Sequence, residues 1–302
     1  MLLPLVSLAA ASGGAFVVGP ATTSLYAGVD AERITRLRGG SSAGDPQVSD
    51  VDQGLSKLTA KAILSYGLAP RTELELTLPW GYNHANRTDG PLCTALGDGC
   101  KTTSGIGVVE AKAKFLVLDE LTGAPLSVAA GVETRFGQLT WATRDRITNL
   151  GEGTSDVGSM LAVGRSGGLG QGGYWAANMS AAARYRFPNT DAGGVAVPGW
   201  ETDGNAEVLL TPTGRWSIGP DVAWFFRPDG IDIETADPTD PDWLASLRVS
   251  KVAVGGSVHL RAREGVVFSG GVLRNVWSVN NPADALLVSV GLQVNRLGRV
   301  ER

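Results

Sequence analysis

Apolar and charged residues alternate along many short stretches of this chain. Within 72–84, Leu74 and Leu76 fall on one side of the alternation, and Glu73 and Glu75 fall on the other. Successive side chains of a β-strand point to opposite faces, so a period of two predicts a strand with one apolar and one charged face. The pattern therefore predicts an all-β protein.

Twelve stretches of this kind follow one another, and no repeat of fixed length is visible beyond them. The 41 glycines and 15 prolines are spread along the whole chain, as many short strands separated by turns require. We place the strands near 22–35, 54–68, 72–84, 106–119, 125–139, 155–166, 173–187, 204–211, 215–227, 246–262, 266–278 and 285–296.

The connections between these strands alternate in length. Those after even-numbered strands are short, such as 69–71 and 212–214, whereas most of those after odd-numbered strands are long and polar, such as 85–105 and 228–245. Outer-membrane barrels have short periplasmic turns and long extracellular loops. We therefore predict a single closed antiparallel transmembrane β-barrel of about 12 strands, located in the bacterial outer membrane. Its expected surroundings are the lipid bilayer and lipopolysaccharide.

The first fifteen residues have the outline of a secretory signal peptide. A short apolar core is followed by small residues, and cleavage after Ala11 or Ala15 would fit. The usual basic residues are missing, which suggests a start codon assigned too far downstream; the alternative is a buried first strand. We assign residues 1–15 to the signal peptide and 16–302 to the barrel, and expect the barrel-assembly machinery as a partner.

The charged faces of the strands are expected to line the barrel lumen. A Lys or Arg on the lipid face costs roughly 2–4 kcal/mol at the bilayer midplane, so these faces must point inward. Mixed signs allow cross-strand pairing along the wall of a solute path. The expected lumen-lining residues are Lys61, Glu73, Glu75, Glu110, Lys112, Lys114, Glu133, Arg135, Arg184, Arg186, Glu207, Asp221, Arg227, Lys251, His259 and Arg261.

Aromatic residues gather near both ends of the predicted strands. Two aromatic rings at the two membrane interfaces would result, although a soluble β-protein would place such residues in its core. Near the long loops lie Trp80, Tyr82, Trp141, Trp224 and Trp277, and near the short turns lie Tyr66, Tyr174 and Trp216.

Three short motifs resemble a known family. They are Asn149–Gly158 (NLGEGTSDVG) with the strand start that follows it, Leu76–Trp80 (LTLPW) and Gly105–Gly107 (GIG). Together they resemble the outer-membrane family called "MetA-pathway of phenol degradation", whose members are described as transporters, with FadL/TodX-like barrels as more distant relatives. The resemblance implies a passive channel for a small molecule, with hydrophobic and aromatic compounds as candidates. Val108 and Val109 stand where that family usually has Gly-Asp.

Motifs for catalysis or nucleic-acid binding are missing from the sequence. No phosphate-binding loop or His-Glu-x-x-His pattern is present, and we expect neither an enzyme nor a cofactor. His259 is in phase with Lys251, which favours a place in the lumen wall over a role in a barrel hydrolase. The net charge of −4 and the lack of a basic tract argue against nucleic acid as a partner.

Two long loops carry further candidate features. Cys93 and Cys100, with six residues between them, lie in the second long loop, which predicts a disulfide in an exported protein; the alternative is a metal site with His84 and Asp98. The acidic loop 228–243 is predicted to be solvated, with calcium binding as the alternative. We predict no metal site.

Three functions remain open at this point. A passive channel for a small molecule would use the mixed-charge wall as its path. A plugged barrel would instead serve as a structural or surface-interaction protein, since twelve strands enclose a narrow lumen that these side chains could fill. A barrel hydrolase is the third alternative.

Overall fold

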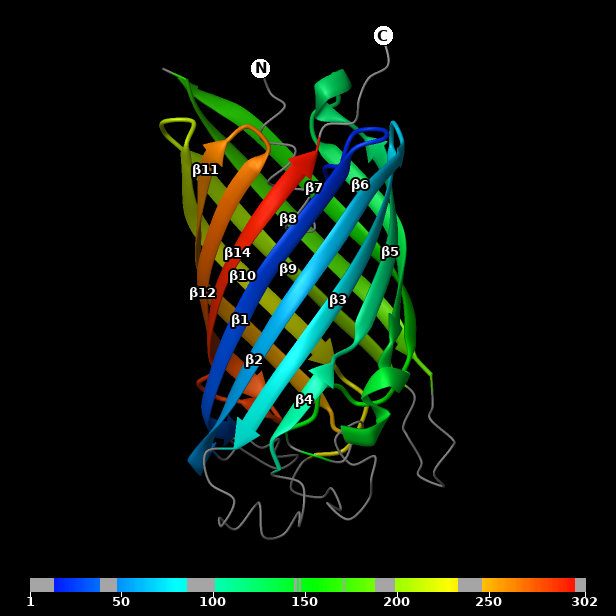
Figure 1. Ribbon diagram of the computed structural model, residues 1–302, viewed down its shortest axis with the longest axis vertical. Coiled ribbons are helices and arrows are strands. Elements are labelled where there is room, and N and C mark those ends of the chain that lie inside the picture. The colour runs from blue at the N-terminus through cyan, green and yellow to red at the C-terminus, as the bar shows by residue number, and fades with distance from the viewer. Residues whose placement is uncertain are drawn as a thin grey trace.

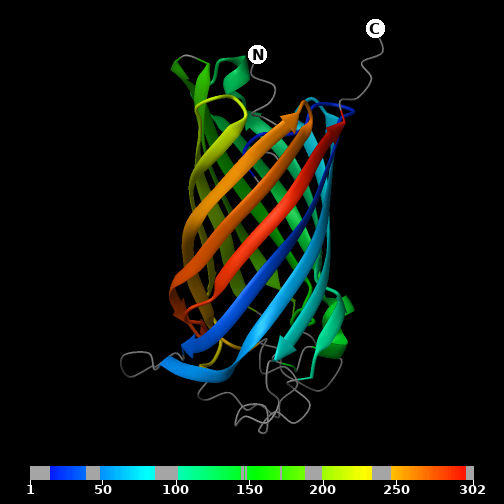
Figure 2. The same cartoon turned by 60° about the vertical axis from the view of Figure 1, so that its left-hand side comes forward.

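The computed structural model describes residues 14–38, 48–85, 101–143, 146, 148–170, 172–187, 199–232 and 246–296. Twelve long strands form one closed antiparallel barrel (Figures 1 and 2), which confirms the predicted fold class. They are β1 (Thr23–Arg38), β2 (Val48–Ala69), β3 (Thr72–Ala85), β5 (Val109–Leu118), β6 (Ser127–Phe136), β7 (Asp156–Gly170), β8 (Gly173–Arg186), β9 (Trp200–Thr211), β10 (Trp216–Arg227), β11 (Val249–Arg263), β12 (Val266–Val279) and β14 (Leu286–Arg296).

Each long strand pairs with the next one along the chain, and β1 closes the barrel by pairing with both β2 and β14. Two short strands lie at the long-loop end: β4 (Thr103–Ile106) pairs with β3, and β13 (Asn281–Pro282) pairs with β1. Two 3-10 helices, η2 (Glu120–Thr122) and η3 (Gly137–Thr143), lie in connections. In the described part of the chain, no helix is long and apolar enough to span a bilayer.

The alternation of loop lengths gives the barrel two different ends. Close turns join β2 to β3, β7 to β8, β9 to β10 and β11 to β12 at one end, where β1 also starts and β14 finishes (Figure 1). Connection 119–126 at this end is ordered by η2, since the Asp119 carboxylate accepts a hydrogen bond from the Leu121 N–H at 2.9 Å. We call this end the short-turn end and the opposite one the long-loop end.

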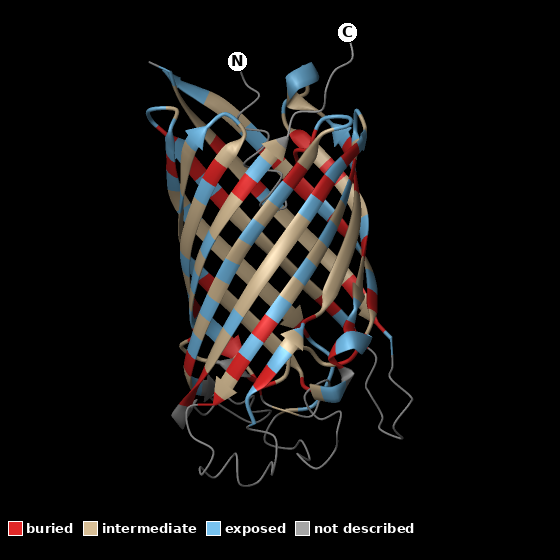
Figure 3. Cartoon of the chain, in the orientation of Figure 1, coloured by how far each residue is buried: buried red, intermediate tan, exposed pale blue. Residues whose placement is uncertain are grey.

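The burial pattern of the barrel is inverted relative to that of a soluble protein (Figure 3). Large apolar side chains such as Leu78 and Val132 are exposed on the outside, by 49% and 60%, whereas Glu73 and Arg184 are each 1% exposed inside. An apolar exterior around a polar interior is the pattern of transmembrane β-barrels. The sequence periodicity produces it, because the charged half of each strand needs partners that lipid does not supply.

Aromatic side chains follow the predicted rings with one correction. Trp80, Trp277 and Trp216 are exposed on the exterior near the expected ends. Tyr174, however, lies in phase with the inward Ala176, and its neighbour Trp175 takes the outward position, where its ring packs over Gly167. The alternation across this turn is shifted by one residue from the prediction. Nothing is described of the Trp141 side chain.

The predicted limits miss the start of β2 by six residues and the start of β9 by four, and the lumen is affected by the difference in β9. This strand starts at Trp200, four residues before the predicted start, so Glu201 and Asp203 belong to the barrel wall and not to a loop. Polar inward residues and the small outward Gly204 hid the alternation at this point. In a strand that separates lipid from a polar lumen, only every second residue needs to be apolar. In β9 the first outward residues after Trp200, such as Gly204, have small side chains.

Candidate solute pathway in the barrel lumen

Charged residues in the lumen form rows that run across neighbouring strands with alternating sign. In one row, Glu110 of β5 lies opposite Arg135 of β6, which lies opposite Asp156 of β7, which lies opposite Arg186 of β8. Opposite charges in directly paired positions stabilise a sheet, and the alternation lets each cation sit between two anions. The inward charges of neighbouring strands therefore pair with one another across the sheet. We call this part of the lumen surface, which runs from β5 to β10, the ion-pair wall.

Glu201 of β9 is the centre of this wall. Its Oε1 accepts from Arg135 Nη1 at 3.1 Å and from Arg184 Nε at 3.0 Å, and its Oε2 lies 3.3 Å from Arg227 Nη2 and 3.9 Å from Arg186 Nε. Burial of four guanidinium groups is tolerable only with such partners, because an unpaired charge in this setting costs several kcal/mol.

A second carboxylate reaches the wall from a loop. Glu152 lies between η3 and β7, and its Oε2 is 2.7 Å from Arg186 Nη2 and 2.8 Å from Arg227 Nη2. The same loop is anchored by Leu150, whose side chain packs against Gly81 of β3, where a Cβ would come within 2.7 Å of it. The segment that carried the family resemblance is thus folded back into the mouth of the barrel.

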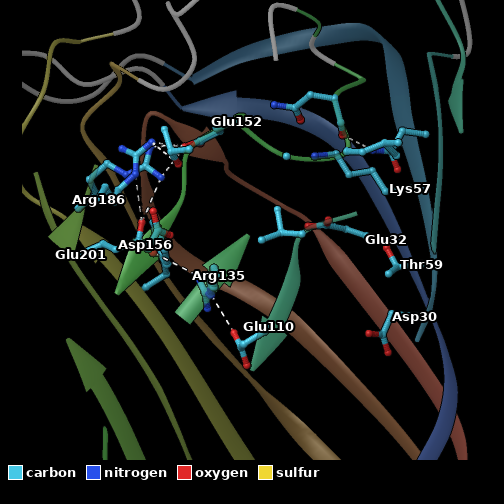
Figure 4. A pocket seen from close by; sticks show the side chains of 18 of the residues that line it. Asp30, Glu32, Lys57, Thr59, Glu110, Arg135, Glu152, Asp156, Arg186 and Glu201 are labelled. Carbon is cyan, nitrogen blue, oxygen red and sulfur yellow. Dashed lines mark hydrogen bonds and ion pairs between the residues drawn. The ribbon is translucent and has the colours of Figure 1, made fainter. Parts of the chain in front are cut away.

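Facing this wall is a cavity of about 560 Å³ at the long-loop half of the lumen. Figure 4 shows Arg135, Glu201 and Arg186 on one side of it, and Asp30 of β1 and Lys57 of β2 on the other. We call it the outer cavity. Six acidic and four basic side chains line it: Asp30, Glu32, Glu110, Glu152, Asp156 and Glu201 against Lys57, Arg135, Arg186 and Arg227.

A second cavity of about 270 Å³ lies in the short-turn half of the lumen, and we call it the inner cavity. Glu207, Asp221 and His259 are among its lining residues. One ion pair lies between the two cavities, since Asp30 lines the outer one, Lys61 lines the inner one, and their Oδ2 and Nζ atoms are 2.8 Å apart. A solute that crosses the lumen would pass this pair.

Residues 14–18 lie inside the barrel near the short-turn end. Ala15 and Val17 are buried and pack with Met160 and other apolar residues of the inner wall. Lys114 Nζ donates to the Phe16 carbonyl at 2.9 Å and to the Gly14 carbonyl at 3.3 Å, while the Val18 N–H donates to Glu73 Oε2 at 2.6 Å. This segment narrows the lumen on the side of β3 to β7.

The structure places all sixteen residues that the sequence assigned to the lumen on inward-facing strand positions. Most belong to the ion-pair wall or line a cavity. Arg261 instead lies at the short-turn rim, where its guanidinium donates to the Gly214 carbonyl, and Lys251 shares the inward phase of β11 with His259.

Several lumen residues were not found by sequence reasoning. Asp30 and Glu32 alternate with apolar residues of β1, which was a usable signal. Glu201 and Asp203 are in phase with Glu207, so a longer β9 would have included them. Glu152 had no such signal, because its position depends on how a loop folds back.

Other sequence predictions fall outside this pathway. His84 lies on the outward face of β3, with its Nδ1 2.8 Å from Thr102 Oγ1. Cys93, Cys100 and Asp98 lie outside the described residues, as does most of the acidic loop, so the disulfide and both metal alternatives stay predictions. Within the described residues no three His, Cys, Asp or Glu side chains are grouped to hold a metal ion.

Comparisons with known proteins give a match only among solved structures. No family model and no curated protein matches the sequence. The crystal structure of the COG4313 outer membrane channel from Pseudomonas putida F1 is similar to this chain with a TM-score of 0.64 and 17% identity, over 93% of this chain and 97% of that one. The NanC porin, at 8% identity and a TM-score of 0.46 over 89% of this chain and 100% of that one, is a more remote match. The first likeness supports the fold, a closed antiparallel barrel.

Proposed function

We propose that this protein is an outer-membrane channel that admits a small solute by passive diffusion. The observation that carries the proposal is the outer cavity, which lies between the ion-pair wall and β1–β2, with the inner cavity on the other side of the Asp30–Lys61 ion pair. Rings of charged side chains around a wet lumen are the usual means by which barrel channels select solutes. The name of the similar Pseudomonas putida structure, an outer membrane channel, supports the same function.

The charge of the outer cavity gives the channel a preference among ions. Six acidic and four basic lining residues leave two net negative charges, so cations should be concentrated there and anions depleted. The sequence motifs resemble those of the "MetA-pathway of phenol degradation" barrels, and we include membership of that family in the proposal. The resemblance adds hydrophobic or aromatic compounds as candidate solutes.

Single-channel recording in planar bilayers tests the proposal. We expect a small conductance whose reversal potential in a KCl gradient indicates K⁺ preference. Thr59 lines the outer cavity, whereas its neighbour Ala60 faces outward. Thr59→Trp should therefore reduce the conductance and Ala60→Trp should leave it unchanged. A folded wild-type barrel without conductance would contradict the channel.

A second candidate function is favoured by residues 14–18. A segment held in the lumen by Glu73 and Lys114 suits a plugged barrel that serves as a structural or surface-interaction protein. Deletion of 14–18 separates the two functions. In a channel narrowed by this segment, the deletion should raise an existing conductance; in a plugged barrel, wild-type protein should be silent.

A further inference from the structure

The inner cavity contains two carboxylates that face each other without a cation between them. Glu207 of β9 and Asp221 of β10 are directly paired across the two strands, and both line the cavity. Like charges in directly opposed positions destabilise a sheet. Where two other described lumen residues are directly paired and both are charged, their signs are opposite. The Glu207–Asp221 pair is therefore an exception.

Neither carboxylate has its hydrogen-bonding capacity filled. Glu207 is 5% exposed, and its Oε1 accepts from Ser257 Oγ at 2.5 Å and lies 3.3 Å from His259 Nε2, but its buried Oε2 has no partner. Asp221 interacts with the Val222 N–H, yet its buried Oδ1 also has no partner. Buried acceptors without donors are costly, and more so when they are charged.

The protein does not supply the missing positive charge from its described residues. Among them, no lysine or arginine forms an ion pair with Glu207 or Asp221, and His259 is the one basic side chain in contact. Lys61 lines the same cavity but is bound to Asp30 at 2.8 Å. The described residues also offer no metal-binding group. A cationic ligand that carries its own N–H donors would supply the missing positive charge and hydrogen-bond donors to the two carboxylates.

The rest of the cavity suits the body of a small organic molecule. Ile63, Val267 and Leu273 give it apolar walls, and about 270 Å³ is available. Tyr26 adds an aromatic ring, which lies against Gly291 so closely that a Cβ there would come within 2.5 Å of it. The glycine thus lets the ring lie along the wall without filling the lumen.

We propose that the inner cavity binds a small organic amine, with its ammonium group against the carboxylates of Glu207 and Asp221 and its carbon body against Ile63, Val267 and Leu273. An ammonium group offers three donors, and its hydrogen bonds to carboxylates are charge-assisted. The inference rests on the proposed function for the route by which the amine arrives, and it names the class of solute that this channel would select.

Isothermal titration calorimetry on the purified barrel in detergent tests the site. The probe is benzylammonium, compared with the neutral benzyl alcohol and the anionic benzoate. We expect benzylammonium to bind and the two others to show no saturable binding. Equal binding of benzyl alcohol would overturn the proposal, because it would make the cavity an apolar site.

Variants separate the two carboxylates from the general charge of the protein. Glu207→Gln and Asp221→Asn should each weaken benzylammonium binding by about 10- to 100-fold, the value of a hydrogen bond to a charged group. Asp221→Asn is the safer variant for folding, because Asp221 lacks the side-chain contacts that Glu207 makes. Glu264→Gln removes one exposed carboxylate at the β11–β12 turn and should leave binding unchanged. Unchanged binding in Asp221→Asn would overturn the site.

Failure of the amine site and failure of the proposed channel give different experimental results. Calorimetry in detergent measures binding at equilibrium and needs no transport. A barrel that binds benzylammonium but shows no conductance would keep the amine site and remove the channel. A barrel that conducts ions but does not bind benzylammonium would do the reverse.

Discussion

Lys114 of β5 and Glu73 of β3 lie directly opposite each other in the lumen, with Nζ and Oε1 3.0 Å apart and with both side chains at most 4% exposed. The same two residues hold the segment 14–18, since Lys114 donates to its carbonyls and Glu73 accepts from the Val18 N–H. One ion pair therefore links the barrel wall to the segment inside it.

Loss of one partner of this pair should destabilise the barrel strongly. Lys114→Met leaves the Glu73 carboxylate buried without its cation, which costs roughly 3–5 kcal/mol. We expect a clearly lower urea midpoint for unfolding from lipid vesicles. The Lys112 side chain is 24% exposed, so Lys112→Met is the matched control and should lower the stability of the barrel less.

The double variant Glu73→Met/Lys114→Met distinguishes charge from packing. Replacing both partners of a buried ion pair by apolar residues is often neutral, so this variant should regain most of the lost stability. A Lys114→Met barrel as stable as the wild type would contradict the buried ion pair.

The strand faces were predictable from sequence, but the contents of the lumen were not. Alternation reports on which side of the wall a residue such as Lys114 lies, and desolvation by lipid assigns that side to the interior. It does not report what else enters the interior. Residues 14–18 and Glu152 reach the wall from outside the strands, and their contacts depend on long-range folding of the connections.

The outer face of β5 allows a direct test of membrane insertion. Ala111 and Ala113 alternate with Lys112 and Lys114 and therefore face outward. Ala111→Lys combined with Ala113→Lys should impair insertion, at roughly 2–4 kcal/mol per lysine near the midplane. The folded fraction in vesicles is measured by the gel shift of unheated protein. Lys112→Gln is the control, and insertion of the double lysine variant at the wild-type level would invert the assigned faces.

The two ends of the barrel should differ in access from the cell exterior. In a Cys93→Ser/Cys100→Ser background, a single cysteine at Asp229 of the long-loop end should react with an impermeant maleimide on intact cells. A single cysteine at Glu264 of the β11–β12 turn should react only after the outer membrane is opened. Both positions are exposed in the structure, so protection reports on the membrane and not on burial. The opposite labelling pattern would reverse the orientation.

Asp284 ties the start of β14 to the end of β1 at the long-loop end. Partial burial raises the pKa of this carboxyl, but hydrogen bonds from the Thr35 hydroxyl and from the Thr35 and Arg36 N–H groups, at 3.3 and 2.9 Å for the two amides, outweigh it and lower the pKa. A lowered pKa means that the contribution to stability is present above the ordinary aspartate pKa of about 4 and is lost as the pH falls through the lowered value.

Asp284→Asn should therefore lower the melting temperature slightly at pH 7, and the difference from wild type should be smaller at pH 3, which lies below the ordinary aspartate pKa. Thermal unfolding followed by circular dichroism at both pH values measures this. Glu264→Gln serves as the exposed control and should show no difference at either pH. A constant difference between pH 7 and pH 3 would mean that the charge of Asp284 does not matter.

Glu152 should set part of the ion preference of the outer cavity. Its side chain is 26% exposed, more than those of Arg186 and Arg227, the two arginines that it contacts. Of these three charges, that of Glu152 is therefore the most accessible from the solute path. Glu152→Gln removes the charge but keeps an acceptor for both arginines, which also retain Glu201. The lining then changes from six acidic and four basic residues to five and four.

A unit charge about 5 Å from a permeating ion in water contributes ~0.8 kcal/mol, which corresponds to about a fourfold change in ion occupancy. Because the charge attracts K⁺ and repels Cl⁻ by this same amount, we expect the K⁺ to Cl⁻ permeability ratio to fall by about 16-fold in Glu152→Gln at low salt. The change should be smaller at 1 M salt, where screening shortens the range of the charge. The ratio is obtained from reversal potentials in KCl gradients. Glu264→Gln removes the same charge outside the lumen and should leave the ratio unchanged. If Glu152→Gln conducts with the wild-type ratio, the ions do not pass along the ion-pair wall, and the path must lie elsewhere in the lumen.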